Sequence, residues 1–167
     1  MGKKKKEVPD YLYANDPFSN FAMVTSNLFT SWQFQELTHA AKNFYLICCV
    51  HKQTAEQAQC LYKALEEYYL SIGEEKSGFD LSLEAGTQPR AKKKSTKFVI
   101  PQSHLLQYGF KPTYATKLKN ELIEKGFIKV FANEKKHAGR GVQGANRDFS
   151  KRVTIYEFTN DWKKREE

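Results

Sequence analysis

The sequence has no hydrophobic run long enough to cross a bilayer. Its longest apolar window, FYLICCV at residues 44–50, is far shorter than the ~20 residues that a membrane-spanning helix requires. The basic opening MGKKKKEVPD is followed by no apolar stretch of the kind found in a secretory signal, and Lys6 stands where an N-myristoylation signal requires Ser or Thr. These absences predict a cytoplasmic protein without a membrane anchor.

Cysteine is scarce, and the chain carries no recognisable catalytic motif. Its three cysteines, Cys48, Cys49 and Cys60, form no Cys-x-x-Cys pair, so we expect reduced thiols and not zinc ligands. The segment GRGVQG lacks the Gly-Lys-Ser/Thr ending of a phosphate-binding loop. The sequence therefore predicts no metal, no cofactor, no small-molecule substrate and no enzyme activity. The four histidines have neither metal-ligand nor triad spacing and are expected to be structural: His39, His51, His104 and His137.

Acidic residues are sparse in one part of the chain. The whole sequence has a net charge of +8, but residues 90–152 contain 16 basic and 4 acidic side chains, a net charge of +12. Residues 1–89 carry a net charge of −3 and residues 153–167 carry −1. A positive excess of this size within one segment is typical of a protein that binds a polyanion such as nucleic acid.

The sequence does contain the patterns of several amphipathic helices. A helix is predicted after the N-cap Thr38, because Ala41, Phe44, Tyr45 and Cys48 recur on one face of it. This spacing is typical of a helix that packs one side against a core.

A second helix is predicted over residues 54–73, where a capping-box spacing marks the start and Gly73 marks the end. Its apolar stripe includes Leu61 and Leu65, and this stripe can serve either packing or self-association. Apolar periodicity then disappears, so a mobile loop is predicted for residues 74–96.

The segment FVIPQSHLLQYGF predicts a short strand and then a short helix. Pro101 is suited to open that helix, Leu105 and Leu106 are expected to face inward, and Gly109 ends it. Pro112 opens the next helix, since proline is favoured at the first helical position. Two short helices joined by a tight, glycine-containing turn form a helix-turn-helix.

The helix that begins at Pro112 has two different faces. Ala115, Leu118 and Leu122 recur at the spacing of a buried stripe. The opposite face carries hydroxyls, an amide and cations, which can hydrogen-bond to base edges and phosphates. The DNA-contacting residues predicted for this recognition helix are Lys111, Thr113, Tyr114, Thr116, Lys117, Lys119 and Asn120.

A β hairpin with a basic loop is predicted next. Gly126 ends the recognition helix, and the segments FIKVF and RVTIYEF are typical of strands. A strand, a basic loop and a strand after a helix-turn-helix form a winged helix, so the predicted fold class is mainly α with a small antiparallel β wing. The DNA-contacting residues predicted for the wing are Lys135, Lys136, His137, Arg140, Arg147, Lys151 and Arg152.

The predicted organisation is a basic, aromatic arm over residues 1–19, a winged-helix domain over 20–163 and a charged tail over 164–167. The domain includes the inserted helix 54–73 and the loop 74–96, and a short strand is expected within FAMVTSNLF. The predicted core is built around Phe44, Tyr45, Leu61, Leu65, Leu105, Leu118, Leu122 and Phe127.

Three segments carry a resemblance to a known family. YGFKPTYATKLKNELIEKGFIKVF, RVTIYEFTNDWK and FAMVTSNLFTSWQFQELTHAAKNFYLICCV resemble the winged-helix domains of proteins from plasmids, phages and conjugative elements of Gram-positive bacteria. They look most like the N-terminal domains of plasmid replication initiators of the replication-initiator-A type. The resemblance covers about residues 20–52 and 97–163. It implies double-stranded DNA as the partner, and a role in replication initiation, in origin binding for transfer or in transcription regulation.

Other functions remain open at this point. A winged helix can serve protein contacts without binding DNA, although the strongly basic wing favours a nucleic acid. An RNA partner is disfavoured, because no aromatic motif of the kind that stacks unpaired bases is present. A homodimer on DNA is a further expectation, since operator-binding proteins are commonly two-fold dimers.

Overall fold

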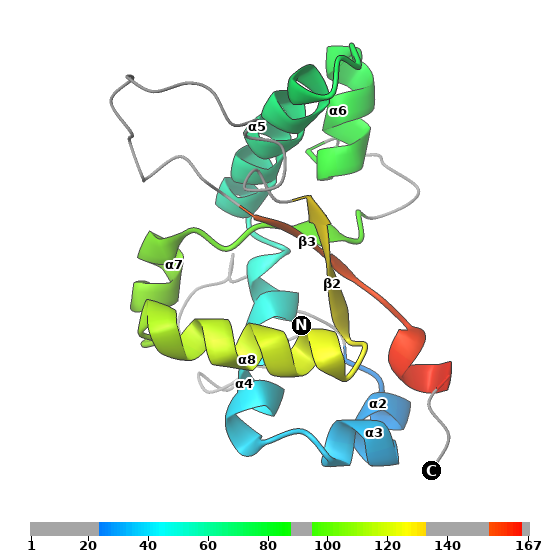
Figure 1. The fold of residues 1–167 in the computed structure, drawn as a ribbon, viewed down its shortest axis with the longest axis vertical. Coiled ribbons are helices and arrows are strands. Elements are labelled where there is room, and N and C mark those ends of the chain that lie inside the picture. The colour runs from blue at the N-terminus through cyan, green and yellow to red at the C-terminus, as the bar shows by residue number, and fades with distance from the viewer. Residues whose placement is uncertain (1–23, 88–94, 133–153, 165–167) are drawn as a thin grey trace, which may run out of the picture.

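The computed structural model describes residues 24–87, 95–132 and 154–164 (Figure 1). The body is built from helices and a small sheet, and a pair of helices projects from one side of it. The helices are α2 (Ser26–Thr30), α3 (Trp32–Gln35), α4 (His39–His51), α5 (Ala55–Ser71), α6 (Gly78–Ala85), α7 (Gln102–Gln107), α8 (Pro112–Glu124) and the 3₁₀ helix η3 (Asp161–Lys164). The fold is therefore mainly helical with a small antiparallel sheet, which confirms the predicted class at this level.

The sheet has three antiparallel strands in the order β1-β3-β2 (β1 Lys97–Phe98, β3 Ile155–Phe158, β2 Ile128–Ala132). Phe98 lies opposite Tyr156, and Val130 lies opposite the same residue from the other side. The pairing of β2 with β3 is irregular between Val130 and Ala132. The last strand in the chain is thus the central one, and it joins the strand before α7 to the strand after α8.

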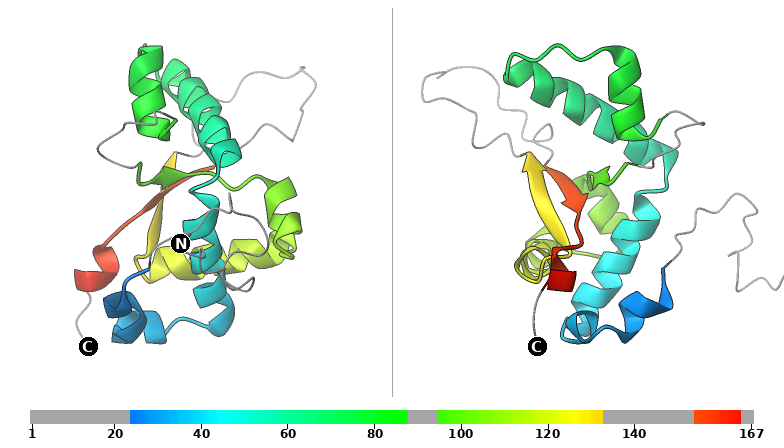
Figure 2. Two further views of the ribbon diagram at one scale, coloured as in Figure 1. Left: turned by 180° about the vertical axis from the view of Figure 1, so that it is seen from behind. Right: turned by 90° about the vertical axis from the view of Figure 1, so that its right-hand side faces the viewer.

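The two faces of the sheet pack against two different cores. Phe98 and Tyr156 belong to the larger core, together with buried residues of α4, α7 and α8. Val99 and Ile155, their neighbours in the chain, belong to a second core with buried residues of α5 and α6. Adjacent residues of a strand point to opposite faces, so the sheet lies between the body and the α5–α6 extension (Figure 2).

Hydroxyl side chains start α4 and α5, as predicted. Thr38 Oγ1 accepts a hydrogen bond from the Ala41 amide, and Thr54 Oγ1 accepts one from the Gln57 amide. Each hydroxyl satisfies an N–H group that has no partner within its helix.

Gly126 ends α8 with a positive φ of 81° and lies against the start of η3. A Cβ at this position would be 2.9 Å from the backbone nitrogen of Trp162, closer than carbon and nitrogen atoms approach without bonding. The turn therefore requires glycine for its backbone conformation and for space.

All eight residues of the predicted core are buried. The stripe of Leu61 and Leu65 on α5 is fully covered by α6 and the sheet. The inserted helix therefore serves packing, and this stripe is not free for self-association. No helix within the described ranges is both long and apolar enough to span a bilayer.

Three local predictions are wrong. Leu106 is 57% exposed, because successive residues of a helix are about 100° apart and only Leu105 of this pair faces the core. Residues 78–85, predicted as part of the loop 74–96, form helix α6, which is capped by Ser77 and buries Leu81 and Ala85. The strand expected within FAMVTSNLF is replaced by helix α2 over its described part, where Leu28 packs into the core.

Candidate nucleic-acid interface

Helix α8 presents most of the predicted contact residues on its outer face. Ala115, Leu118 and Leu122 point into the larger core, where α8 packs against α4 and α7. The side of the helix away from this stripe faces solvent. Six of the seven predicted residues are exposed there: Lys111, Thr113, Tyr114, Thr116, Lys117 and Asn120.

The N-terminal end of α8 is open to an anion. Pro112 occupies the first turn, no acidic side chain lies there, and no side chain caps the helix. Free amide groups and the helix dipole make such an end attractive to phosphate. Thr116 Oγ1 donates a hydrogen bond to the Pro112 carbonyl at 3.0 Å, which leaves its oxygen to accept one from outside.

Lys119 differs from the other predicted contact residues. It is half-buried, and its Nζ lies 5.2 Å from the ring centroid of Tyr156 in the sheet. Burial lowers the pKa of the Lys119 ammonium. The residue packs between α8 and the sheet, so it does not join the exposed face that its six companions form.

The acidic residues in the second half of α8 include one that is tied to the body. The Glu121 carboxylate accepts hydrogen bonds from the amide of Thr38 at 2.8 Å and from its hydroxyl at 2.9 Å, which fixes α8 to the start of α4. Lys125, just past the helix, pairs with Glu36 at 2.9 Å. Lys111 and Lys117, by contrast, form no ion pair with any residue that the structure describes. The uncompensated positive charge of the helix is therefore concentrated in its first half.

The predicted wing lies outside the described residues. Strands β2 and β3 pair as the arms of a hairpin, and Lys129 of β2 forms an ion pair with Glu157 of β3 at 3.1 Å. The connection between the strands comprises residues 133–154, and the structure describes only the last of these. All seven predicted wing residues belong to it: Lys135, Lys136, His137, Arg140, Arg147, Lys151 and Arg152.

A buried hydrogen-bond chain of two histidines is a feature that sequence analysis missed. His51 Nδ1 lies 3.0 Å from the Tyr108 hydroxyl, and His51 Nε2 lies 3.2 Å from the Val99 carbonyl and 3.4 Å from His104 Nδ1. His104 Nε2 contacts a Glu56 carboxylate oxygen at 2.9 Å. Nothing local in the sequence signals this cluster, because its side chains come from α4, α5 and the segment of α7 and Tyr108, which are far apart in the chain.

The hydrogen-bond partners define the protonation of this chain. The Val99 carbonyl can only accept, so His51 Nε2 carries a proton and His51 Nδ1 accepts from Tyr108. His104 then donates from Nε2 to Glu56 and accepts at Nδ1. Burial, with a smaller contribution from His104, lowers the pKa of His51 to about 4. The His51 ring therefore fits this cluster in the neutral form.

The cysteines show no sign of a metal or nucleophile site. Cys48 is buried, and burial raises the pKa values of both Cys48 and Cys49, which leaves these thiols protonated and unreactive. Cys60 is half-buried, and all three cysteines are free. Among the residues the structure describes, no three His, Cys, Asp or Glu side chains gather closely enough to hold a metal ion.

Comparison with models of protein families, with curated proteins and with solved structures finds no match to this chain.

Proposed function

We propose that this protein binds double-stranded DNA as a winged helix, with α8 as the recognition helix and the connection between β2 and β3 as the wing. The order of elements supports this reading. Around the α5–α6 extension, the chain runs through α4, strand β1, helices α7 and α8, and the paired strands β2 and β3. A winged helix has this sequence of a helix, a strand, two helices and a β hairpin.

The observation that carries the proposal is the composition of the exposed face of α8. A helix selected only for solubility mixes acids and bases over its surface. The first three turns of α8 instead expose Thr113, Thr116, Lys117 and Asn120, and the first acidic residue is Glu121, which is bound to Thr38. Hydroxyls and amides can read base edges in the major groove, and the lysines can contact phosphates.

The biological setting that we propose follows from the resemblance to winged-helix domains of Gram-positive plasmids, phages and conjugative elements. In that setting the protein acts in replication initiation, in origin binding for transfer or in transcription regulation. These three roles share one requirement, which is recognition of a particular duplex sequence. Isolating the preferred duplex from a random-sequence pool is therefore the first experiment.

A salt titration with matched lysine variants tests the proposed surface. Lys117→Ala should weaken binding to every duplex and reduce the slope of log K against log salt by about one, because one phosphate contact is lost. Lys63→Ala removes the same charge from an exposed position on α5 and should leave the slope unchanged. Equal behaviour of the two variants would contradict the assignment. Stronger binding to single strands or to RNA would favour a different nucleic acid, and no binding would favour a protein-contact module.

A further inference from the structure

The α5–α6 extension has a charge opposite to that of the rest of the chain. Residues 54–87 contain seven acidic and two basic side chains, a net charge of −5, within a protein whose total is +8. Five of these acids are exposed and form no ion pair with any residue in the described ranges: Glu66, Glu67, Glu74, Glu75 and Asp80. Exposed acids repel polyanions. This surface is therefore unsuited to DNA and to an anionic bilayer.

The same extension exposes large apolar side chains. Leu70 and Phe79 are 65% and 63% exposed, more than any other large hydrophobic residue that the structure describes, and Ile72 and Leu83 are exposed as well. Phe79 and Leu83 are four residues apart on α6 and therefore share one face of it. Exposed apolar groups bordered by charges mark sites of protein interaction.

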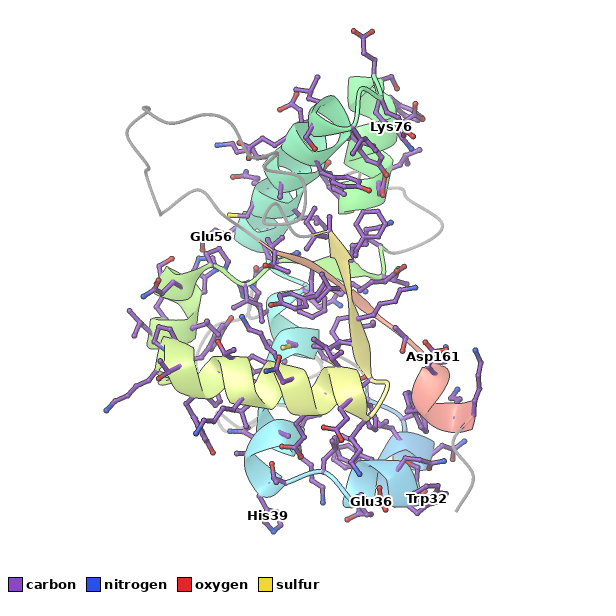
Figure 3. The ribbon with its side chains drawn as sticks, viewed as in Figure 1. Trp32, Glu36, His39, Glu56, Lys76 and Asp161 are labelled. Atoms are coloured by element: carbon purple, nitrogen blue, oxygen red, sulfur yellow. The ribbon has the colours of Figure 1, made fainter. Side chains whose placement is uncertain are left out.

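Packing and polar contacts fix α5 and α6 to each other and to the sheet. Leu61 and Leu65 of α5 pack with Leu81 of α6 in the second core. The Glu84 carboxylate accepts hydrogen bonds from the Tyr69 hydroxyl at 2.9 and 3.0 Å, and it pairs with Lys97 of β1 at 2.8 Å. Figure 3 shows Lys76 at the outer end, away from the body. A surface held in place in this way loses little entropy when a partner binds.

We propose that the outer end of the α5–α6 extension, residues 70–83, is a docking site for a basic, amphipathic helix of a partner protein. Apolar side chains of that helix would cover Leu70 and Phe79, and its lysines or arginines would neutralise the acids around them. Charge complementarity selects this occupant. A second copy of the chain docking through the same surface would bring two acidic ends together, which like-charge repulsion opposes.

Binding of synthetic peptides to the full chain tests the proposal. The probe is a fluorescent amphipathic helix with leucines on one face and lysines on the other. A second peptide replaces its leucines with serine, and a third replaces its lysines with glutamate. Fluorescence anisotropy should show that the first peptide binds at least ~10-fold more tightly than either of the others, because both kinds of contact contribute.

Variants of the chain locate the site. Leu70→Ser combined with Phe79→Ser should weaken binding of the first peptide at least ~10-fold, whereas Leu106→Ser, at a comparably exposed leucine on α7, should not. Glu74→Lys should weaken binding more than Glu124→Lys, which makes the same charge change on α8. Circular dichroism confirms that each variant is folded. Duplex DNA binding by the leucine and phenylalanine variant should be unchanged, so this proposal and the DNA-binding proposal can fail separately.

Three results would overturn the inference. Equal binding of the leucine and serine peptides would show that the surface attracts the peptide through charge alone, without an apolar contact. Equal binding by the chain and its Leu70→Ser, Phe79→Ser variant would place the contact elsewhere. Self-association by light scattering that this variant abolishes would make the occupant a second copy of the chain.

Discussion

The rings of His51 and His104 meet in the protein interior, with Nε2 of the first 3.4 Å from Nδ1 of the second. The two residues are 53 positions apart in the chain and belong to α4 and α7. Glu56 extends the contact to α5, and Tyr108 closes it on the other side. One polar cluster therefore joins the body, the root of the extension and the helix that precedes α8.

The first prediction concerns acid stability. Folding lowers the pKa of His51 from 6.5 to about 4, so the unfolded chain binds more protons between these two pH values. The free energy of unfolding should therefore be fully retained above pH 6.5 and fall by up to about 3 kcal/mol as the pH drops to 4. Urea unfolding at a series of pH values measures this slope.

His51→Phe should remove most of that slope, whatever it does to stability at neutral pH. His39→Gln, at an exposed histidine on the same helix, should leave the slope as it is. If the two variants keep the same pH dependence as the original chain, the neutral His51 cluster is not its source.

The second prediction concerns the buried face of α8. Leu118→Ala should lower the free energy of unfolding by ~2–5 kcal/mol, because the side chain is buried in the larger core and its loss leaves a cavity. Leu106→Ala, at an exposed leucine, should change it by no more than about 0.5 kcal/mol. Chemical denaturation of both variants measures the difference, and a small effect at Leu118 would contradict the assignment of the helix faces.

The third prediction compares two glycines with the same backbone conformation. Gly109 and Gly126 have φ values of 80° and 81°, but a Cβ meets nothing within 4 Å at Gly109 and lies 2.9 Å from the Trp162 nitrogen at Gly126. Gly109→Ala should lower the free energy of unfolding by about 1–2 kcal/mol, because alanine is disfavoured in the left-handed conformation. Gly126→Ala should cost clearly more, because η3 must also move. Thermal or urea unfolding measures both changes, and equal losses of unfolding free energy would contradict the prediction.

The fourth prediction separates the readout of sequence from general affinity. Asn120→Ala should cost ~1–3 kcal/mol on the preferred duplex and reduce the discrimination between duplexes, because an amide contact to a base edge is lost. Arg140→Ala, in the predicted wing, should weaken all duplexes alike and lower the salt slope by about one. Titrations against the preferred and a scrambled duplex measure both effects. Identical losses on the two duplexes for Asn120→Ala would remove it from base recognition.

Local patterns predicted helices α4, α5, α7 and α8 but missed the short helices α2, α3 and α6. The stripe of Ala115, Leu118 and Leu122 is sufficient to orient α8, because one face of a helix must be buried. Helix α6 spans only eight residues and buries only Leu81 and Ala85. Two buried positions are too few to reveal a helical period in the sequence. The sequence nevertheless marks the start of α6 with a serine at the N-cap, because Ser77 Oγ accepts a hydrogen bond from the Asp80 amide.

The candidate site was predictable to a similar extent. Exposure of Thr113, Thr116 and Asn120 follows from the helical period alone. The half-buried position of Lys119 depends on Tyr156, which lies far along the chain, and no local rule could supply that contact. The pairing of His51 with His104 was unpredictable for the same reason.

The sheet that lies between two cores has a consequence for anyone who would shorten this chain. Residues 54–96 read as an insertion between α4 and β1, and an engineer would be inclined to replace them with a short linker. Such a deletion would uncover Val99 and Ile155, both buried against α5 and α6, and leave an apolar sheet face in water. A minimal version of the protein would need polar residues at these positions to avoid aggregation through this face. Helices α5 and α6 are therefore an integral part of the fold, although they are an insertion in the order of elements.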